Sequence, residues 1–577
     1  MNIVAVVCWF SLVAPAWALN RQAFTFTRYD LEAKIEPWQQ RLGVRGKIRL
    51  RNDSRAAEKN LVLQISSSLN WSSIALGGKS VQFLSQLYNS DIDHTGSLRE
   101  AVVTLPQSIP PQNSIELEVG YEGVIPQDST RLVRMGVPVE AAQRSDWDRI
   151  SNAFSIVRGI GYVAWYPIAT EAVLLAEGNT VFREVGRWKR RQSDSEMNIR
   201  FCLLKQSPMP LALMNDGASS PGASSSTAAS AAETFGCGSH LFSPLGFTVP
   251  TFAVGDYREK KKVEMDLYYL PGNESSANDY ALAIEETAPV VRSWFEANQE
   301  TTHSKPLEVE LPETGASPFA AGNMLLLPLS ATDAVLILSA VEQLTQSIVA
   351  SPRAWIFEGL PGYAQVNYLE LRRGREAAMR YLENHRSALV ETEKQAAARK
   401  PEPAEHSLLA ANDELYIQAK AMYVWWMLKD MLGENTLHAA LRNYRADADR
   451  DPHYIEQLIA SESHRDLGWF FDDWVYHDRG LPDFHIVSVY SHLQGNSAYM
   501  VTVMIENRGG AAAEVPVTVH FSGGERTERL MVGNRAKASV RILAAAAPRE
   551  VTVNDGSVPE LGGSDHSYQF SSSSEQK

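Results

Sequence analysis

The apolar residues of this chain follow two different spacings, and the spacing changes twice. Apolar and polar residues alternate from about residue 20 to about residue 125, and again beyond Leu481, as in Val515-Pro516-Val517-Thr518-Val519. Between about residues 277 and 432 the apolar residues recur instead at i, i+3 and i+4. Alternation is typical of half-buried strands, and the second spacing is typical of amphipathic helices. The sequence therefore predicts a multidomain α+β protein, with a β domain, a mainly helical domain and a second β domain.

The predicted domain boundaries follow these changes. The first β domain, antiparallel, extends over residues 19–255, and its Ser/Ala/Gly-rich segment 216–233 predicts a disordered surface loop. The helical spacing falls within residues 256–480. Short strands with Gly-rich turns over residues 481–562 predict a β-sandwich, and the Ser-rich residues 563–577 predict a disordered tail. The expected helices are 281–297, 334–350, 358–370, 375–400 and 416–432.

The N-terminus predicts export. An apolar run from about Ile3 to Ala14 is too short to span a bilayer and is followed by Ala16-Trp17-Ala18, an A-x-A cleavage signal. We interpret residues 1–18 as a signal peptide and expect a periplasmic or extracellular protein; the alternative is a frayed apolar strand. In an oxidising compartment Cys202 and Cys237 could form a disulfide or remain two separate buried thiols.

Composition excludes several functional classes. The chain has 54 Lys and Arg against 68 Asp and Glu, a formal net charge of −14, which argues against a nucleic-acid partner. Three cysteines are too few for a Cys-rich zinc module. No later stretch is long and apolar enough to be a transmembrane segment. The sequence also lacks a G-x-S-x-G elbow and a P-loop.

Four short strings together resemble the M1 family of gluzincin aminopeptidases. They are Val163-Ala164-Trp165-Tyr166-Pro167, Phe319-Ala320-Ala321-Gly322-Asn323-Met324, Trp355-Ile356-Phe357-Glu358-Gly359 and Phe470-Phe471-Asp472-Asp473-Trp474-Val475. The resemblance covers most of residues 25–560. It implies a saddle-like N-terminal β domain, a thermolysin-like catalytic domain and a C-terminal β-sandwich. The apolar strand that begins at Met324 is expected along the edge of the catalytic cleft.

The resemblance also implies where a zinc site should be. The family carries H-E-x-x-H on a helix, in which two His bind zinc and the Glu is the general base. Local similarity places Glu342 and Gln346 at the two His positions and Gln343 at the general-base position. Glu358 retains the position of the third ligand. No two of the 13 histidines are four residues apart, so the chain has no H-x-x-x-H anywhere.

An ungapped alignment gives a second register, with Val335, Leu336 and Ser339 at the three positions of the motif. Neither register leaves a zinc site, because an amide is a poor zinc donor and cannot act as a base. A cluster of Glu342, Gln346 and Glu358 would be an oxygen site, better suited to calcium or magnesium.

Two further features of the family are changed. The motif glutamate that contacts the free amine of the substrate corresponds to Gly322, followed by Asn323. The family's catalytic Tyr lies two residues before a Lys, and here that spacing falls on Gln418, before Lys420. Tyr416, four residues before the Lys, is a tentative oxyanion stabiliser or a core tyrosine.

These observations favour an exported M1-peptidase-like protein without bound zinc or hydrolytic activity, a pseudoenzyme that binds a peptide or a protein. No cofactor is expected. The alternative is an active metallo-aminopeptidase that holds zinc with non-standard ligands. A third hypothesis is an interaction protein whose cleft has filled in.

Overall fold

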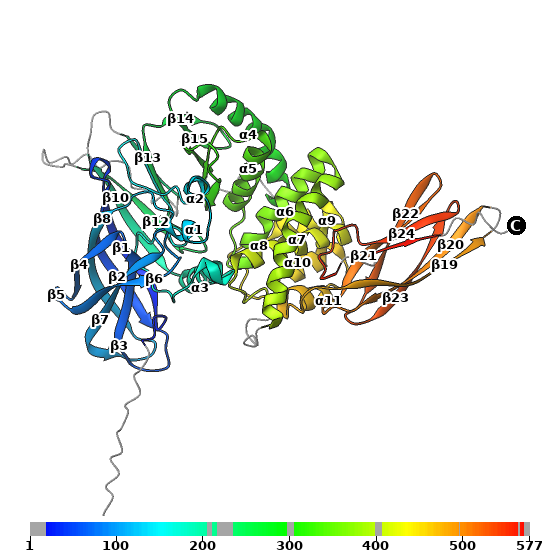
Figure 1. The fold of residues 1–577 in the computed structure, drawn as a ribbon, viewed down its shortest axis with the longest axis horizontal. Helices are drawn as coiled ribbons and strands as arrows, with labels where there is room; N and C mark the ends of the chain where they lie inside the picture. The colour runs from blue at the N-terminus through cyan, green and yellow to red at the C-terminus, as the bar shows by residue number, and fades with distance from the viewer. Residues whose placement is uncertain are drawn as a thin grey trace, which may run out of the picture.

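Three regions follow one another along the long axis of the molecule (Figure 1). The computed structural model describes residues 19–204, 210–215, 235–296, 305–398, 407–494, 497–562 and 566–570. The predicted signal peptide and the predicted loop 216–233 lie outside these residues. Strands of the first region lie at one end, helices form the middle, and a small sandwich of strands forms the other end.

The N-terminal β region contains a seven-stranded sheet in the order β12-β10-β1-β2-β8-β4-β5 and a three-stranded sheet in the order β3-β7-β6. Their inward side chains form one apolar core, as the alternating spacing predicts. One pairing departs from the antiparallel pattern, because β1 and β10 run parallel. The strands are β1 Phe24–Glu36, β2 Arg41–Asn52, β3 Glu58–Ser66, β4 Leu69–Leu76, β5 Lys79–Ser80, β6 Gln82–Asn89, β7 Ser97–Ile109, β8 Ser114–Val124, β10 Glu196–Leu204 and β12 Phe235–Phe242.

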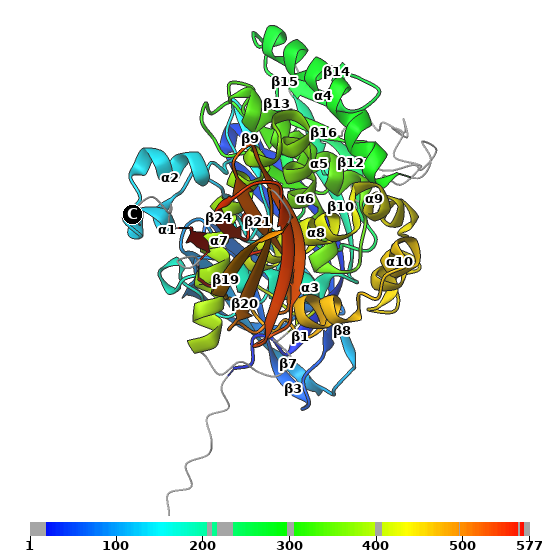
Figure 2. The same ribbon diagram turned by 90° about the vertical axis from the view of Figure 1, so that its right-hand side faces the viewer.

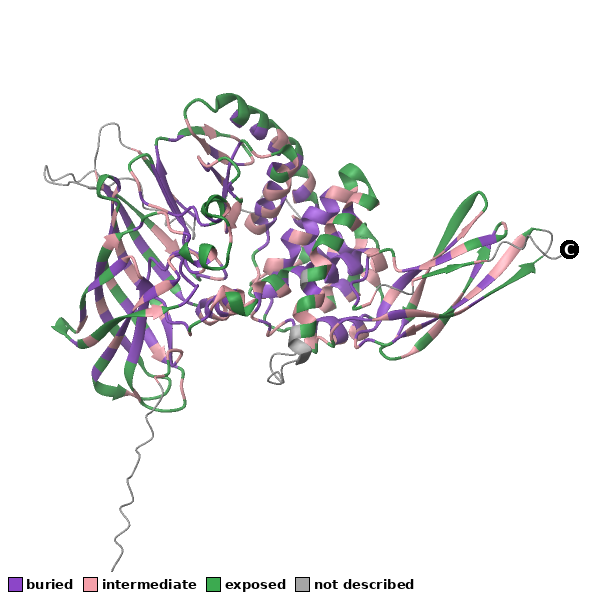
Figure 3. Ribbon diagram, viewed as in Figure 1, coloured by how far each residue is buried: buried purple, intermediate pink, exposed green. Residues whose placement is uncertain are grey.

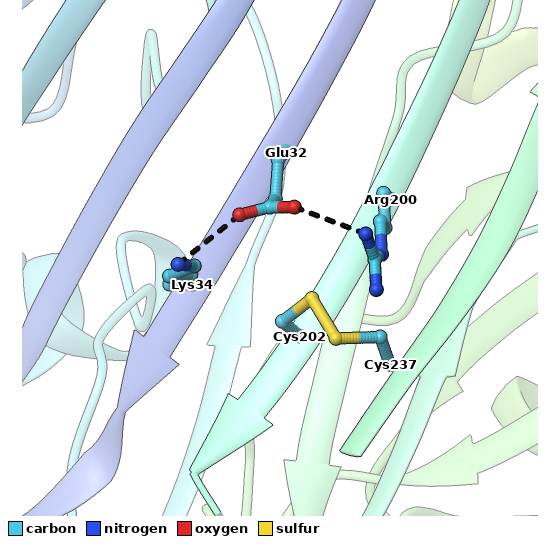
Figure 4. The surroundings of a disulfide bond; sticks show 5 residues. All are labelled: Glu32, Lys34, Arg200, Cys202 and Cys237. Carbon is cyan, nitrogen blue, oxygen red and sulfur yellow. Dashed lines mark ion pairs between the residues drawn. A yellow bond between two sulfur atoms is a disulfide. The ribbon is translucent and has the colours of Figure 1, made fainter. Parts of the chain in front are cut away.

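Cys202 and Cys237 form a disulfide that joins β10 to β12 (Figure 4). The two residues are direct partners in the antiparallel register, and their Cα atoms are 4.1 Å apart. Beside the disulfide, Glu32 pairs with Lys34 at 3.2 Å and with Arg200 at 3.4 Å. Of the two alternatives left open by the sequence, the structure therefore has the disulfide.

The N-terminal β region also contains helices that the sequence did not predict. Three helices lie in this part of the chain: α1 Thr130–Arg134, α2 Val139–Ser145 and α3 Thr180–Gln192. In α3 the residues Val181, Val185 and Trp188 are buried at helical spacing, a short signal within a strand-rich stretch. A further sheet in the order β11-β13-β9 completes the region, with β9 Phe154–Val157, β11 Leu211–Met214 and β13 Phe252–Gly255.

The middle region begins with a five-stranded mixed sheet in the order β14-β15-β16-β18-β17. Its strands are β14 Arg258–Lys261, β15 Asp266–Tyr269, β16 Leu307–Glu310, β17 Phe319–Ala321 and β18 Met324–Leu327. The helices of the region include all five that the sequence predicts. They are α4 Glu274–Phe295, α5 Asp333–Ile348, α6 Ala354–Arg373, α7 Arg375–Ala398, α8 Glu414–Leu432, α9 Glu434–Asn443, α10 Tyr454–Ser463 and α11 Gly468–Phe471. Helix α4 lies between β15 and β16, and the others follow the sheet.

Helices α6 and α8 pack closely, and this contact positions much of the candidate site. A Cβ at Gly359 of α6 would clash with Ala421 of α8, so the close approach requires glycine here. Trp355 stacks on Trp425 with ring centroids 4.9 Å apart. Figure 3 shows that the helix faces turned toward one another are buried. The contact brings Glu358 of α6 next to the first turns of α8.

The C-terminal region is a sandwich of two sheets, in the orders β19-β20-β23 and β22-β21-β24-β25. It lies in front when the molecule is viewed along its long axis (Figure 2). The predicted tail is in part wrong, because Ser567–Gln569 form β25 against β24. The strands are β19 Phe484–Gln494, β20 Ala498–Asn507, β21 Ala513–Phe521, β22 Gly524–Val532, β23 Lys537–Ala544, β24 Pro548–Val553 and β25 Ser567–Gln569.

Candidate functional site

A cavity of about 410 Å³ lies between the N-terminal β region and the helical region. Helix α3 and nearby loops line it on one side, and β17 with α5, α6 and α8 line it on the other. Polar and charged side chains line both sides, and apolar and aromatic side chains form much of the remaining wall. The cavity therefore offers both charged and apolar contacts.

Two residues of α5 bring the predicted ligand positions into this cavity. Glu342 and Gln346 are four residues apart on one helix face, and both line the cavity. Glu358, in the second turn of α6, lines it as well. None of the three residues of the ungapped register does so. The gapped alignment thus gathers its three predicted ligand positions at one site.

Gln343, at the general-base position, faces elsewhere. Its side chain is buried and lies outside the cavity lining. The Gln343 amide donates from Nε2 to the backbone oxygen of Asn323 at 2.6 Å. Gln343 therefore connects α5 to the β17–β18 turn and does not face the cavity.

The β17–β18 turn carries the position of the family's amine-recognition motif. Gly322 lines the cavity with φ +60°, a backbone conformation that favours glycine. Asn323 is buried and donates from Nδ2 to the backbone oxygen of Lys305 at 3.2 Å. The cavity edge is formed by residues 318–322, and the prediction that the strand from Met324 would line it is wrong.

Helix α8 contributes Gln418 rather than Tyr416. Gln418 lines the cavity and donates from Nε2 to a carboxylate oxygen of Glu358 at 2.9 Å. It is also the position that the family spacing assigns to the catalytic tyrosine. Tyr416 is absent from the lining, and its hydroxyl lies 2.6 Å from Asp478 and 2.9 Å from Glu393. The arrangement gives no support to an oxyanion role for Tyr416.

Lys189 was not anticipated from the sequence. It projects from α3 into the cavity, and its Nζ lies 2.6 Å from a carboxylate oxygen of Glu414, at the start of α8. Glu414 lines the cavity too. The signal that could have revealed this pair is the helical spacing of Val181, Val185 and Trp188 in α3. Three glutamates and one lysine thus line the cavity. We refer to these side chains, Lys189, Glu342, Glu358 and Glu414, as the polar end of the cavity.

The environment raises the pKa of Glu342 and of Glu358. Burial raises the pKa of Glu342 to about 7, and repulsion from Glu358 adds to this, while a hydrogen bond from Gln365 opposes it. Burial also raises the pKa of Glu358; Lys189 and the Gln418 hydrogen bond oppose this rise, and Glu414 reinforces it. Crowded carboxyl groups in a partly closed site hold protons more tightly than they would in water.

The side chains at the three ligand positions fit zinc poorly. They offer two carboxylates and one amide, with no histidine or cysteine, and Glu342 and Glu358 already accept hydrogen bonds from Gln365 and Gln418. In the part of the chain that the structure describes, no three His, Cys, Asp or Glu side chains are grouped to hold a metal ion.

Part of the lining is an aromatic and apolar wall. Phe247 packs against Phe357 with ring centroids 5.9 Å apart, and Tyr162 meets Phe319 edge to face at 5.3 Å. Arg131, the other cation of the lining, forms two hydrogen bonds to Asp146 and also donates to the backbone oxygens of Asp91 and Gly161. Four of its five N–H donors are thus committed to the protein itself.

The structure resembles that of a known aminopeptidase. It matches a crystal structure of Legionella pneumophila aminopeptidase A in complex with aspartic acid, with a TM-score of 0.57 and 11% identity. The fold is M1 aminopeptidase-like. The match covers 96% of this chain and 61% of the other, so this chain spans about three fifths of that aminopeptidase. No family model and no curated protein matches the sequence.

Two crystal structures of an M1 zinc metallopeptidase from Deinococcus radiodurans show a weaker likeness to this chain. One is a mutant bound to a Tyr-Ser-Ala substrate, with a TM-score of 0.45, 12% identity, and coverage of 80% of this chain and 96% of that one. The other has a TM-score of 0.44, 13% identity, and coverage of 79% and 95%.

Proposed function

We propose that the cavity binds the amino-terminal end of a peptide and does not hydrolyse it. The observation that carries this proposal is the composition of the polar end, which has the carboxyl groups of Glu342, Glu358 and Glu414 against the single ammonium of Lys189. Negative charge is in excess there, which favours a ligand amine. The aromatic wall offers apolar contact to the first side chain of the peptide.

Hydrolysis lacks two of its requirements in this proposal. A metallopeptidase needs a metal that polarises the carbonyl and acidifies water, and a base that accepts the proton. The ligand positions fit zinc poorly, and Gln343 is an amide that points away from the cavity. General-base catalysis alone contributes about 10²–10⁴-fold in rate. Without a metal ion and a general base, turnover should not rise above background.

We place the protein outside the cytoplasm, in the periplasm or the extracellular space, on the basis of the signal peptide predicted at residues 1–18. None of the described helices is long and apolar enough to cross a bilayer. The disulfide between Cys202 and Cys237 supports an oxidising compartment.

The test is turnover of aminoacyl fluorogenic substrates and short peptides by the full chain with added zinc. A Glu358→Ala variant is the control, because it removes the retained ligand position. We expect the two proteins to be indistinguishable and the peptides to bind intact, as followed by calorimetry and mass spectrometry. Chelator-sensitive turnover by the unmodified protein above that of the control would establish the alternative, an active metallo-aminopeptidase.

A further inference from the structure

Lys189 reaches the cavity from a helix that is firmly anchored across the boundary between two regions. A Cβ at Gly186 of α3 would clash with the backbone oxygen of Asn412, so α3 lies directly on the segment that leads into α8. Arg190 donates hydrogen bonds to the backbone oxygens of Leu409 and Ala411 in the same segment. These contacts fix the base of the Lys189 side chain.

The ammonium of Lys189 has N–H donors that can bind a ligand. It carries three N–H groups, and in the described part of the chain its one ion-pair partner is Glu414. Its side chain is 14% exposed, and it lines the cavity. Arg131, the other cation of the lining, donates its hydrogen bonds to Asp146 and to two backbone oxygens. Lys189 is therefore the cation of the lining that can bind a ligand.

The charge state of Lys189 suits a hydrogen-bond donor. Burial works against its charge, but the carboxylates of Glu414 and Glu358 outweigh this effect, and the pKa of Lys189 is raised. The side chain remains an ammonium at neutral pH. It is not an amine nucleophile, and it needs an acceptor oxygen or another anion as its partner.

We propose that Lys189 donates to the first carbonyl oxygen of the bound peptide, in the role that a metal ion would play in a metallopeptidase. This inference rests on the proposed function, because it assumes that the ligand amine lies beside Glu342 and Glu358. The cavity then recognises an α-amino acyl group, in which an amine and a carbonyl group are attached to the same carbon. A simple amine satisfies only half of the site.

The probes are phenylalaninamide and 2-phenylethylamine, titrated calorimetrically into the full chain. Both have an amine and a phenyl ring, but only the first has a carbonyl oxygen. A hydrogen bond to a charged group predicts that the unmodified protein binds phenylalaninamide about ten- to a hundredfold more tightly. Lys189→Met, which keeps the stem of the side chain and removes its charge, should bring this preference close to one.

Arg187→Met is the matched control, because it removes another cation of the same helix, one that pairs with Glu184 and lies outside the cavity lining. It should keep the preference of the unmodified protein. A Lys189→Met variant that folds and still prefers phenylalaninamide would overturn the role of Lys189 and leave the proposed function standing. If that variant does not fold, equal affinity of the unmodified protein for the two probes would overturn it. Failure of the unmodified protein to bind either probe, or any amino-acyl peptide, would overturn the proposed function itself.

Discussion

Two lysines held by carboxylates illustrate how burial alone does not distinguish structure from function. Lys420 of α8 is fully buried and donates to Asp478 at 2.7 Å, to the backbone oxygen of Gly480 at 3.0 Å and to Glu393 at 3.1 Å. Lys189 of α3 pairs with one carboxylate and keeps part of its surface open to a cavity. The first ammonium has all of its donors satisfied by the protein, and the second does not.

The number of donors satisfied by the protein therefore distinguishes a structural lysine from a ligand-binding lysine better than the charge itself does. A saturated ammonium adds rigidity where the helical region meets the C-terminal sandwich. An unsaturated ammonium in a cavity is costly unless water or a ligand completes its partners. The two lysines should therefore respond differently to substitution, and the following predictions measure this difference.

Lys420→Met should have the largest effect, on stability. It leaves Glu393 and Asp478 buried without their shared cation, and breaking a buried pair in this way costs about 3–5 kcal/mol. Denaturant unfolding monitored by tryptophan fluorescence should show this loss. The probe preference of the folded protein should stay unchanged. A loss below about 1 kcal/mol would show that the cluster around Lys420 is not saturated as described.

The acidic side of the cavity should make ligand affinity depend on pH. The pKa of Glu342 is about 7, so acidification through pH 7 protonates it and removes negative charge that attracts the ligand amine. Affinity for phenylalaninamide should therefore fall as the pH drops from 7 to 5, by at most about tenfold for each pH unit. Glu342→Gln should flatten this dependence in the same calorimetric titration. A wild-type affinity that is flat over this range, or that rises as the pH drops, would contradict the assignment.

Tyr416→Phe separates the two clusters, because Tyr416 contacts the carboxylates around Lys420. It should cost about 1 kcal/mol of stability, the usual worth of a hydrogen bond, measured by denaturant unfolding. Affinity for both probes should not change. A loss of ligand affinity without a loss of stability would restore a binding role for Tyr416.

Lys189→Met should have the smallest effect on stability. Its partner Glu414 is partly exposed, so solvent replaces much of the lost ion pair, and the expected cost is below about 1 kcal/mol. Unfolding measured beside Lys420→Met gives the comparison directly. Equal losses for the two variants would mean that Lys189 is a structural lysine like Lys420.

The sequence was sufficient for the order of regions and for the long helices of the middle region. Apolar spacing repeated over several turns, as in α5 and α8, is a strong local signal. The parallel pairing of β1 with β10 could not be predicted, because it joins residues more than 150 positions apart through contacts with no local pattern. The helix α3 was missed because its apolar spacing extends over about two turns among strand-like segments.

The same limits apply to the candidate site. The alignment placed Glu342, Gln346 and Glu358 together because the family resemblance carries their spacing with it. Lys189 could not be assigned by that route, because it comes from another region of the chain and from a position that the family strings do not include. A contact made across two regions needs the three-dimensional arrangement.

In this account the ammonium of Lys189, and not a metal ion, binds the carbonyl oxygen of the ligand at the polar end of the cavity. Elemental analysis of the mature full chain, purified in the presence of excess zinc and then desalted, tests it most directly. We expect well under one equivalent of zinc per chain, unchanged by Glu358→Ala, because the three ligand positions lack histidine and cysteine. One equivalent of zinc that is lost on substitution of Glu358 would contradict the claim.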